Sequence, residues 1–214
     1  MSDNILVIDN FVPKILQNQL EEIACRDQHI DYYFRRDPAY PENDENLPIF
    51  RQNDPNIVDK KEFIFYHNLL TPTKKSEFYN DFVCIPNKIM KSWDVPMRHT
   101  RSRLILSPPL PHTQNMYGVP HPDFNGIDNT GDGGGHKTAI YYISDSDGDT
   151  ILFDEYYTGK LEHTKKTIYK RISPKKGRLV IFDALRYHAN SWSTQKERVL
   201  VNMIFERISD PTPS

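Results

Sequence analysis

The sequence predicts a mainly β protein of the α+β class, a double-sheet jelly roll (a double-stranded β-helix) with N-terminal helices packed on one sheet. Helical periodicity is confined to the first hundred residues, whereas the chain after residue 100 is a series of short apolar or alternating runs bounded by turn residues. The connections between most of these runs leave little room for crossover helices, so we expect their strands to pair largely antiparallel.

The N-terminal segment predicts a strand followed by a helix. Residues 5–8 form a short apolar run, which favours a strand. Pro13 suits the first turn of a helix, because its missing N–H would have no partner there. Apolar residues then follow at helical spacing, so we expect an amphipathic helix over residues 13–26.

The rest of the first hundred residues divides into an irregular and a helical part. Residues 35–60 are rich in proline, asparagine and aspartate, which predicts a long excursion without regular structure. Residues 74–93 show helical periodicity again, although Pro86 must kink or break that helix.

The second half of the chain supplies the expected strands. Asp147-Gly148 and Lys176-Gly177 lie between strand candidates, as hairpin connections do. A glycine-rich segment, residues 125–136, predicts a loop. The expected strands are Ser102–Ser107, Thr138–Ser144, Thr150–Asp154, Thr167–Ile172, Arg178–Asp183 and Arg198–Ile208.

The length of 214 residues fits one domain, which we expect to span residues 1–214. Within it we expect residues 1–99 to give helical support, residues 100–208 to form the jelly-roll core and residues 209–214 to be a tail.

Charge and composition limit the kinds of partner that the protein can bind and the compartment in which we expect it. The formal charge of -2 argues against a nucleic-acid partner, and no apolar run approaches the roughly 20 residues of a membrane span. The N-terminus lacks the basic and apolar regions of a signal peptide. With only two cysteines and no export signal, we expect a cytoplasmic protein with reduced thiols.

Histidine and aspartate spacing provides a candidate metal site. The pattern His-x-Asp occurs twice, at His29–Asp31 and at His121–Asp123. Eight histidines and 19 aspartates would give about 0.7 such pairs by chance, so the pattern alone decides nothing. His29 follows the first helix, where a polar helix exit explains it without a metal.

The neighbouring residues of the second His-x-Asp pair, His121–Asp123, are more informative. Pro120 and Pro122 bracket His121 and favour extended backbone. In extended backbone the side chains of His121 and Asp123 project to one side, so both could hold the same ion. A loop histidine beside a turn aspartate is the alternative explanation.

A C-terminal stretch adds a third histidine and an arginine. A buried run ends at His188, a polar turn follows, and Arg198 opens another apolar run. A charge that leads into a buried strand needs a partner, and a ligand carboxylate held by the guanidinium is one candidate. An ordinary strand start at the surface is the other.

The ordered set of His121, Asp123, His188 and Arg198 resembles the Fe(II)- and 2-oxoglutarate-dependent dioxygenases, and within them the prolyl 4-hydroxylase-like branch. His188 follows His121 by 67 residues, and Arg198 lies ten further on. The strand, acidic turn and strand at 138–155 are also similar to that branch. The resemblance covers residues 100–208 well and the N-terminal hundred loosely.

The resemblance implies a set of roles. His121, Asp123 and His188 would ligate Fe(II) as the catalytic centre, and Arg198 would pair with the far carboxylate of 2-oxoglutarate. Tyr142 would help to hold that carboxylate, and Tyr141 would pack on the opposite face, although the reverse assignment stays open. O2 is the second cosubstrate, and ascorbate is a further candidate cofactor. The implied reaction hydroxylates a C–H bond and releases succinate and CO2.

The substrate and the alternatives stay open at this stage. A peptidyl proline leads by resemblance only, and another protein side chain, a free amino acid or a small metabolite fits equally well. Asp123 argues against halogenation, because halogenating relatives replace that carboxylate with a small residue. A non-catalytic jelly-roll module that binds a peptide or sugar is the main alternative, and a cupin-type metalloenzyme without cosubstrate is a weaker one.

Overall fold

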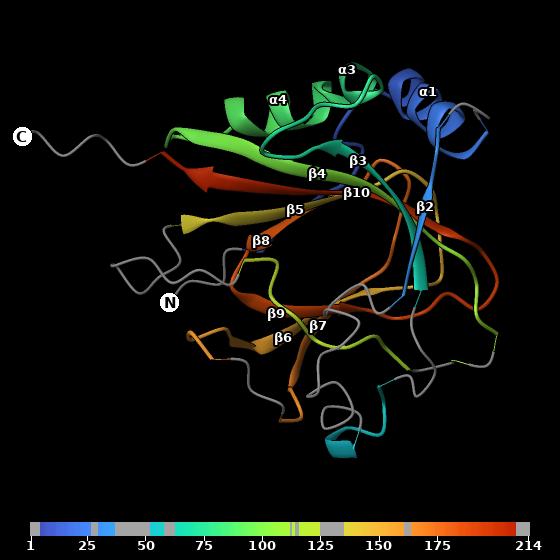
Figure 1. The fold of residues 1–214 in the computed structure, drawn as a ribbon, viewed down its shortest axis with the longest axis vertical. Helices are drawn as coiled ribbons and strands as arrows, with labels where there is room; N and C mark the ends of the chain where they lie inside the picture. The colour runs from blue at the N-terminus through green and yellow to red at the C-terminus, as the bar shows by residue number, and fades with distance from the viewer. Residues whose placement is uncertain are drawn as a thin grey trace, which may run out of the picture.

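The computed structural model confirms a mainly β protein built from two antiparallel sheets (Figure 1). It describes residues 5–26, 30–36, 52–57, 63–111, 113, 116–124, 135–160 and 164–208. Within these residues one sheet has seven strands, in the order β1-β8-β5-β10-β4-β3-β2, and the other has three, in the order β7-β6-β9. The strands are β1 (Leu6–Ile8), β2 (Tyr33–Arg36), β3 (Phe63–Leu70), β4 (Met97–Ser107), β5 (Lys137–Tyr142), β6 (Thr150–Tyr156), β7 (Ile168–Ile172), β8 (Leu179–Asp183), β9 (Arg186–Asn190) and β10 (Arg198–Arg207).

Three helices cover one face of the seven-stranded sheet (Figure 1). They are α1 (Lys14–Cys25), α3 (Tyr79–Phe82) and α4 (Cys84–Lys91). Leu20 of α1 and Ile89 of α4 are buried in one cluster with side chains of β4, β5, β8 and β10. The expected packing of N-terminal helices on one sheet is therefore confirmed. No helix in the described residues combines the length and apolarity needed to cross a membrane.

The second helical stretch is broken, as Pro86 predicts. Pro86 has no N–H to donate to the carbonyl of Phe82, and its ring would press against that carbonyl. The first helix therefore stops at Phe82, and the next begins at Cys84. Helical structure begins at Tyr79 instead of residue 74, because Lys75 pairs in a β-bridge with Leu70.

The large sheet contains more of the first hundred residues than the sequence predicts. β2 and β3 join it through β4, and β4 begins five residues before the expected start at Ser102. Basic residues in that part of β4 mask its strand pattern, but pairing with β10 along its length satisfies its backbone. Residues 37–51 and 58–60 of the expected irregular excursion lie outside the described residues.

The run of residues 177–188 is two strands and not one buried strand that ends at a histidine. β8 belongs to the seven-stranded sheet and β9 to the three-stranded sheet. The carboxylate of Asp183 accepts a hydrogen bond from the backbone N–H of Leu185 at 2.9 Å, which stabilises a tight turn between them. This turn transfers the chain from one sheet to the other and places His188 in the middle of β9.

A half-buried histidine on β4 predicts a pH-dependent stability. His99 lies between the rings of Tyr79 and Phe205, and burial lowers its pKa from the ordinary 6.5 to about 4. As the pH falls from about 6.5 to 4, the unfolded chain gains a proton that the folded chain does not, so the free energy of unfolding decreases. We expect His99→Phe to flatten this decrease, and urea unfolding between pH 7 and 4 measures it. The pKa of His121 is lowered in the same sense, so the decrease should shrink but persist.

Candidate active site

The two histidines that the sequence predicts as ligands lie side by side. An isolated antiparallel bridge pairs His121 with His188, and each backbone N–H donates to the carbonyl of the other, at 2.9 and 3.0 Å. Their ring centroids are 4.6 Å apart. Residues that are far apart in the chain are therefore fixed together by backbone pairing, which holds them more rigidly than side-chain contacts alone.

Asp123 completes this group at the open edge of the two sheets. Its backbone N–H donates to the carbonyl of Ala184 at 3.1 Å, which holds it opposite the β8–β9 turn. Its carboxylate is 9% exposed. The groups around that carboxylate are Arg101 Nη2 at 3.2 Å, Thr138 Oγ1 at 3.0 Å, Asn202 Nδ2 at 3.0 Å and His188 Nε2 at 3.4 Å.

The three side chains can act together on one metal ion. One ligand atom from each of His121, Asp123 and His188 lies within 4.8 Å of the others. The Nδ1 atoms of the histidines lie 2.9 Å from the carbonyl of Val119 and 3.2 Å from that of Arg186. Each of these contacts favours the tautomer with hydrogen on Nδ1, so the Nε2 lone pair of each histidine is available to a metal.

The charge states of the group suit a divalent cation. Burial, and after it the proximity of His188, lowers the pKa of His121 to about 4, so its imidazole is neutral near pH 7. Burial alone would raise the pKa of Asp123, but attraction to His188 and Arg101 holds it far below the ordinary value. Two imidazoles and one carboxylate are the donor set of non-haem Fe(II) sites that keep open positions for further ligands.

Arg198 lies in the same cavity and is buried, and no carboxylate of the described residues lies within ion-pair distance of it. It is 5% exposed, and its Nη2 donates to Thr150 Oγ1 at 2.6 Å. Its Nε is buried and, among the described residues, has no hydrogen-bond partner. Burial lowers the pKa of this guanidinium, and nearby Tyr142 opposes that effect. An arginine with an unused buried donor is suited to bind an anionic ligand.

The two neighbouring tyrosines of β5 face opposite sides of the large sheet. Tyr141 packs in the cluster under the helices, and Tyr142 in the cluster between the sheets. The Tyr142 hydroxyl donates to Thr150 Oγ1 at 2.6 Å, and its ring centroid lies 5.6 Å from the guanidinium carbon of Arg198. Tyr142 is therefore beside Arg198, and Thr150 joins the two.

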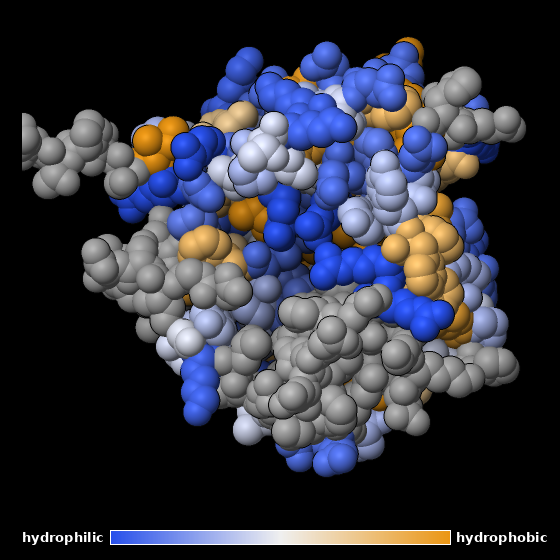
Figure 2. Space-filling view, in the orientation of Figure 1, coloured by the Kyte–Doolittle hydropathy of each residue, from blue (hydrophilic) through white to orange (hydrophobic). Residues whose placement is uncertain are grey.

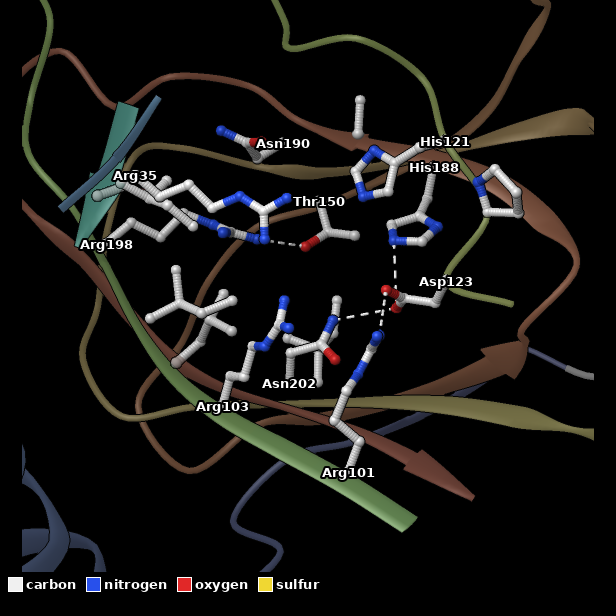
Figure 3. Close-up of a pocket in the computed structure, with 17 residues that line it drawn as sticks. Arg35, Arg101, Arg103, His121, Asp123, Thr150, His188, Asn190, Arg198 and Asn202 are labelled. Carbon is white, nitrogen blue, oxygen red and sulfur yellow. Dashed lines mark hydrogen bonds and ion pairs between the residues drawn. The ribbon is translucent and has the colours of Figure 1, made fainter. Parts of the chain in front are cut away.

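The three candidate metal ligands, Thr150 and Arg198 line a cavity of about 330 Å³ between the sheets (Figure 3). Asp123 and the two histidines lie at one end, and Arg198 with Thr150 at the other. Apolar side chains from β5 and β10, Ile140 and Leu200, form part of the wall between them.

Several residues of the site are missed by the sequence reasoning. Asn202 is visible in the sequence only as a polar interruption of an apolar run, and it is a direct partner of Asp123. Thr138, Thr150 and Arg101 carry no local signal, because each reaches the site through strand pairing with distant segments.

Of the other histidines considered in the sequence, the structure describes His136. His136 stacks on Phe124, with ring centroids 3.9 Å apart, and is not one of the three clustered ligands. His29 and residues 125–134 of the expected glycine-rich loop lie outside the described residues.

Solved structures share this fold over nearly the whole chain. One is the viral collagen prolyl hydroxylase vCPH from Paramecium Bursaria Chlorella virus-1 in complex with 2-oxoglutarate, at 14% identity and a TM-score of 0.53, with 97% of this chain and 98% of that chain covered. A second is a Pseudomonas putida prolyl-4-hydroxylase, at 13% identity and a TM-score of 0.52, with 97% and 95% covered. A third is HygX from Streptomyces hygroscopicus with nickel, 2-oxoglutarate and hygromycin B bound, at 10% identity and a TM-score of 0.59, with 96% and 84% covered.

The protein therefore has the jelly-roll fold of Fe(II)- and 2-oxoglutarate-dependent oxygenases, and prolyl hydroxylases are among the structures that it resembles. The resemblance inferred from the sequence is confirmed at the level of the fold. No protein-family model matches the chain, and no curated protein matches it in sequence.

Proposed function

We propose that the protein is an Fe(II)- and 2-oxoglutarate-dependent dioxygenase that hydroxylates a C–H bond. The observation that carries the proposal is the clustering of His121, Asp123 and His188 in one cavity with Arg198, whose buried Nε has no partner in the described residues. Bound iron would couple the oxidative decarboxylation of 2-oxoglutarate by O2, which gives succinate and CO2, to hydroxylation; one oxygen atom of O2 would enter succinate and the other the hydroxylated product.

In this proposal the residues of the chain bind and orient the metal and 2-oxoglutarate, and they exclude water from the reacting bond. His121, Asp123 and His188 hold the metal, and the hydrogen bonds on their far sides keep them in place. Arg198 pairs with the far carboxylate of 2-oxoglutarate, and Tyr142 supports it through Thr150. Ile140 and Leu200, which form part of the cavity wall, help to keep water from the reacting bond.

The domain organisation belongs to the same proposal. We treat residues 1–214 as a single oxygenase domain, with residues 100–208 as its catalytic core and residues 1–99 as support. β2 and β3 come from the supporting part and extend the sheet that carries the site.

The substrate class is less closely defined than the reaction. A peptidyl proline is one candidate, because prolyl hydroxylases share the fold. HygX, which also shares it, is known with the small molecule hygromycin B bound. A free amino acid, another protein side chain or a metabolite therefore stands beside peptidyl proline.

The proposal predicts a spectroscopic signal that needs no substrate. Anaerobic addition of Fe(II) and 2-oxoglutarate should produce the visible metal-to-ligand charge-transfer band that arises when both bind at one centre. A chelator should remove it, and Fe(II) alone should not produce it. A folded, metal-loaded protein without the band would contradict the proposal and favour a non-catalytic binding module.

A further inference from the structure

The cavity contains more cations than the proposed cosubstrate uses. Among the described residues that line it, the charged ones are Asp123 and four arginines, namely Arg35, Arg101, Arg103 and Arg198. The proposed function assigns Arg198 to 2-oxoglutarate, and Arg101 pairs with Asp123 at 3.2 Å. Two arginines, Arg35 and Arg103, have no assigned partner.

Arg103 is held in place with its charge unpaired. It follows Arg101 by two residues on β4, so both side chains project from the same face of the strand into the cavity (Figure 3). Its Nε donates to Asn68 Oδ1 at 3.0 Å, and its guanidinium carbon lies 5.5 Å from the ring centroid of Tyr66. None of the described carboxylates lies within ion-pair distance of Arg103, so its other nitrogen atoms are available to a ligand.

Arg35 reaches the same cavity from the edge strand β2. Its side chain is partly buried, and within the described part of the chain it forms no hydrogen bond or ion pair. Burial, and then repulsion from Arg101 and Arg35, lowers the pKa of Arg103, so the guanidinium groups are close enough to oppose one another. An anion between them would relieve that repulsion.

We propose that the substrate is a small acidic molecule whose carboxylate or phosphate group pairs with Arg103 and Arg35. The proposal rests on the proposed function, because Arg198 is reserved for 2-oxoglutarate. Guanidinium groups match both oxyanions, since each offers two parallel N–H donors. The volume of about 330 Å³ lies at the low end for ligand sites, and Figure 2 shows hydrophilic side chains along part of the rim of the hollow. An uncharged prolyl side chain would leave both arginines without a partner.

A binding experiment on non-reacting protein tests this. Nickel(II) replaces iron, 2-oxoglutarate saturates the Arg198 site, and butyrate, butyramide and inorganic phosphate are titrated by NMR. We expect an anion to bind and neutral butyramide not to bind. Arg103→Gln and Arg35→Gln should each weaken anion binding by about 10-fold or more. Preference for butyrate identifies a carboxylate substrate, and preference for phosphate identifies a phosphorylated one.

Two control variants test whether anion binding depends on the arginines of the cavity or on any arginine of the same strands. Arg98→Gln changes an exposed arginine on β4 that pairs with Glu206, and Arg36→Gln changes the exposed neighbour of Arg35. Both should bind anions as the unchanged protein does. If Arg103→Gln does not fold, Arg35→Gln and Arg103→Lys test the same pair.

The outcomes distinguish this inference from the proposed function. Absence of any anion binding, equal binding of butyrate and butyramide, or unchanged binding in both cavity variants overturns the acidic substrate. The charge-transfer band with Fe(II) and 2-oxoglutarate should persist in the Arg103 and Arg35 variants. Loss of that band from the unchanged protein contradicts the proposed function instead.

Discussion

Asp123→Ala and His188→Ala are each expected to abolish succinate release from 2-oxoglutarate. Partners that only orient metal ligands already contribute roughly 10- to 100-fold to metal affinity or activity, so loss of a ligand should exceed 100-fold. Succinate release and bound iron, measured on the same preparation, check the prediction. We expect both to fall together, because the two side chains provide ligand atoms within one 4.8 Å cluster.

The fold should survive these two substitutions. The sheets are held together by backbone hydrogen bonds. The bridge between residues 121 and 188 also uses backbone atoms, so it does not depend on the side chain at position 188. Asp154→Ala removes an exposed carboxylate from β6 and serves as the control with unchanged iron content. If both ligand variants fail to fold, the side chains have a structural role and the metal assignment is wrong.

Part of the geometry of the candidate metal-binding group can be predicted from the sequence, because that part is local. The extended backbone that Pro120 and Pro122 favour projects His121 and Asp123 to one side, and this preference is local. Their meeting with His188 depends on strand pairing, which the sequence indicates only through the ordered set of motifs. The partners of the carboxylate, Thr138 and Asn202, come from β5 and β10, and their inward positions depend on register.

The difference between local preferences and long-range strand pairing also explains which parts of the fold can be predicted. Helix α1 follows from its periodicity, and the break near Pro86 follows from the chemistry of proline. Periodicity does not assign β8 and β9 to different sheets, because both strands are buried and only Ala184 and Leu185 separate them. The short turn at Asp183 that sends them to different sheets is stabilised by a single side-chain hydrogen bond.

Arg198→Met is expected to weaken 2-oxoglutarate binding strongly. Truncating one partner of a buried, hydrogen-bonded charge pair costs about 2–5 kcal/mol, which is roughly 30- to 5000-fold in the dissociation constant. Titration of the charge-transfer band with 2-oxoglutarate measures this directly. Arg198→Lys keeps the charge but loses the two parallel donors, so it should bind with an intermediate affinity.

The same substitution should stabilise the ligand-free protein. Arg198 is 5% exposed, no described carboxylate lies within ion-pair distance of it, and its Nε is an unsatisfied buried donor. Leaving such a donor unpaired costs about 1–3 kcal/mol, and methionine fills similar space without that cost. We therefore expect a higher free energy of unfolding for Arg198→Met in urea, together with its loss of 2-oxoglutarate affinity. If Arg198 serves to bind a ligand, its replacement raises the free energy of unfolding and lowers the affinity for 2-oxoglutarate. A variant that is less stable and still binds 2-oxoglutarate normally would show instead that Arg198 is a structural residue.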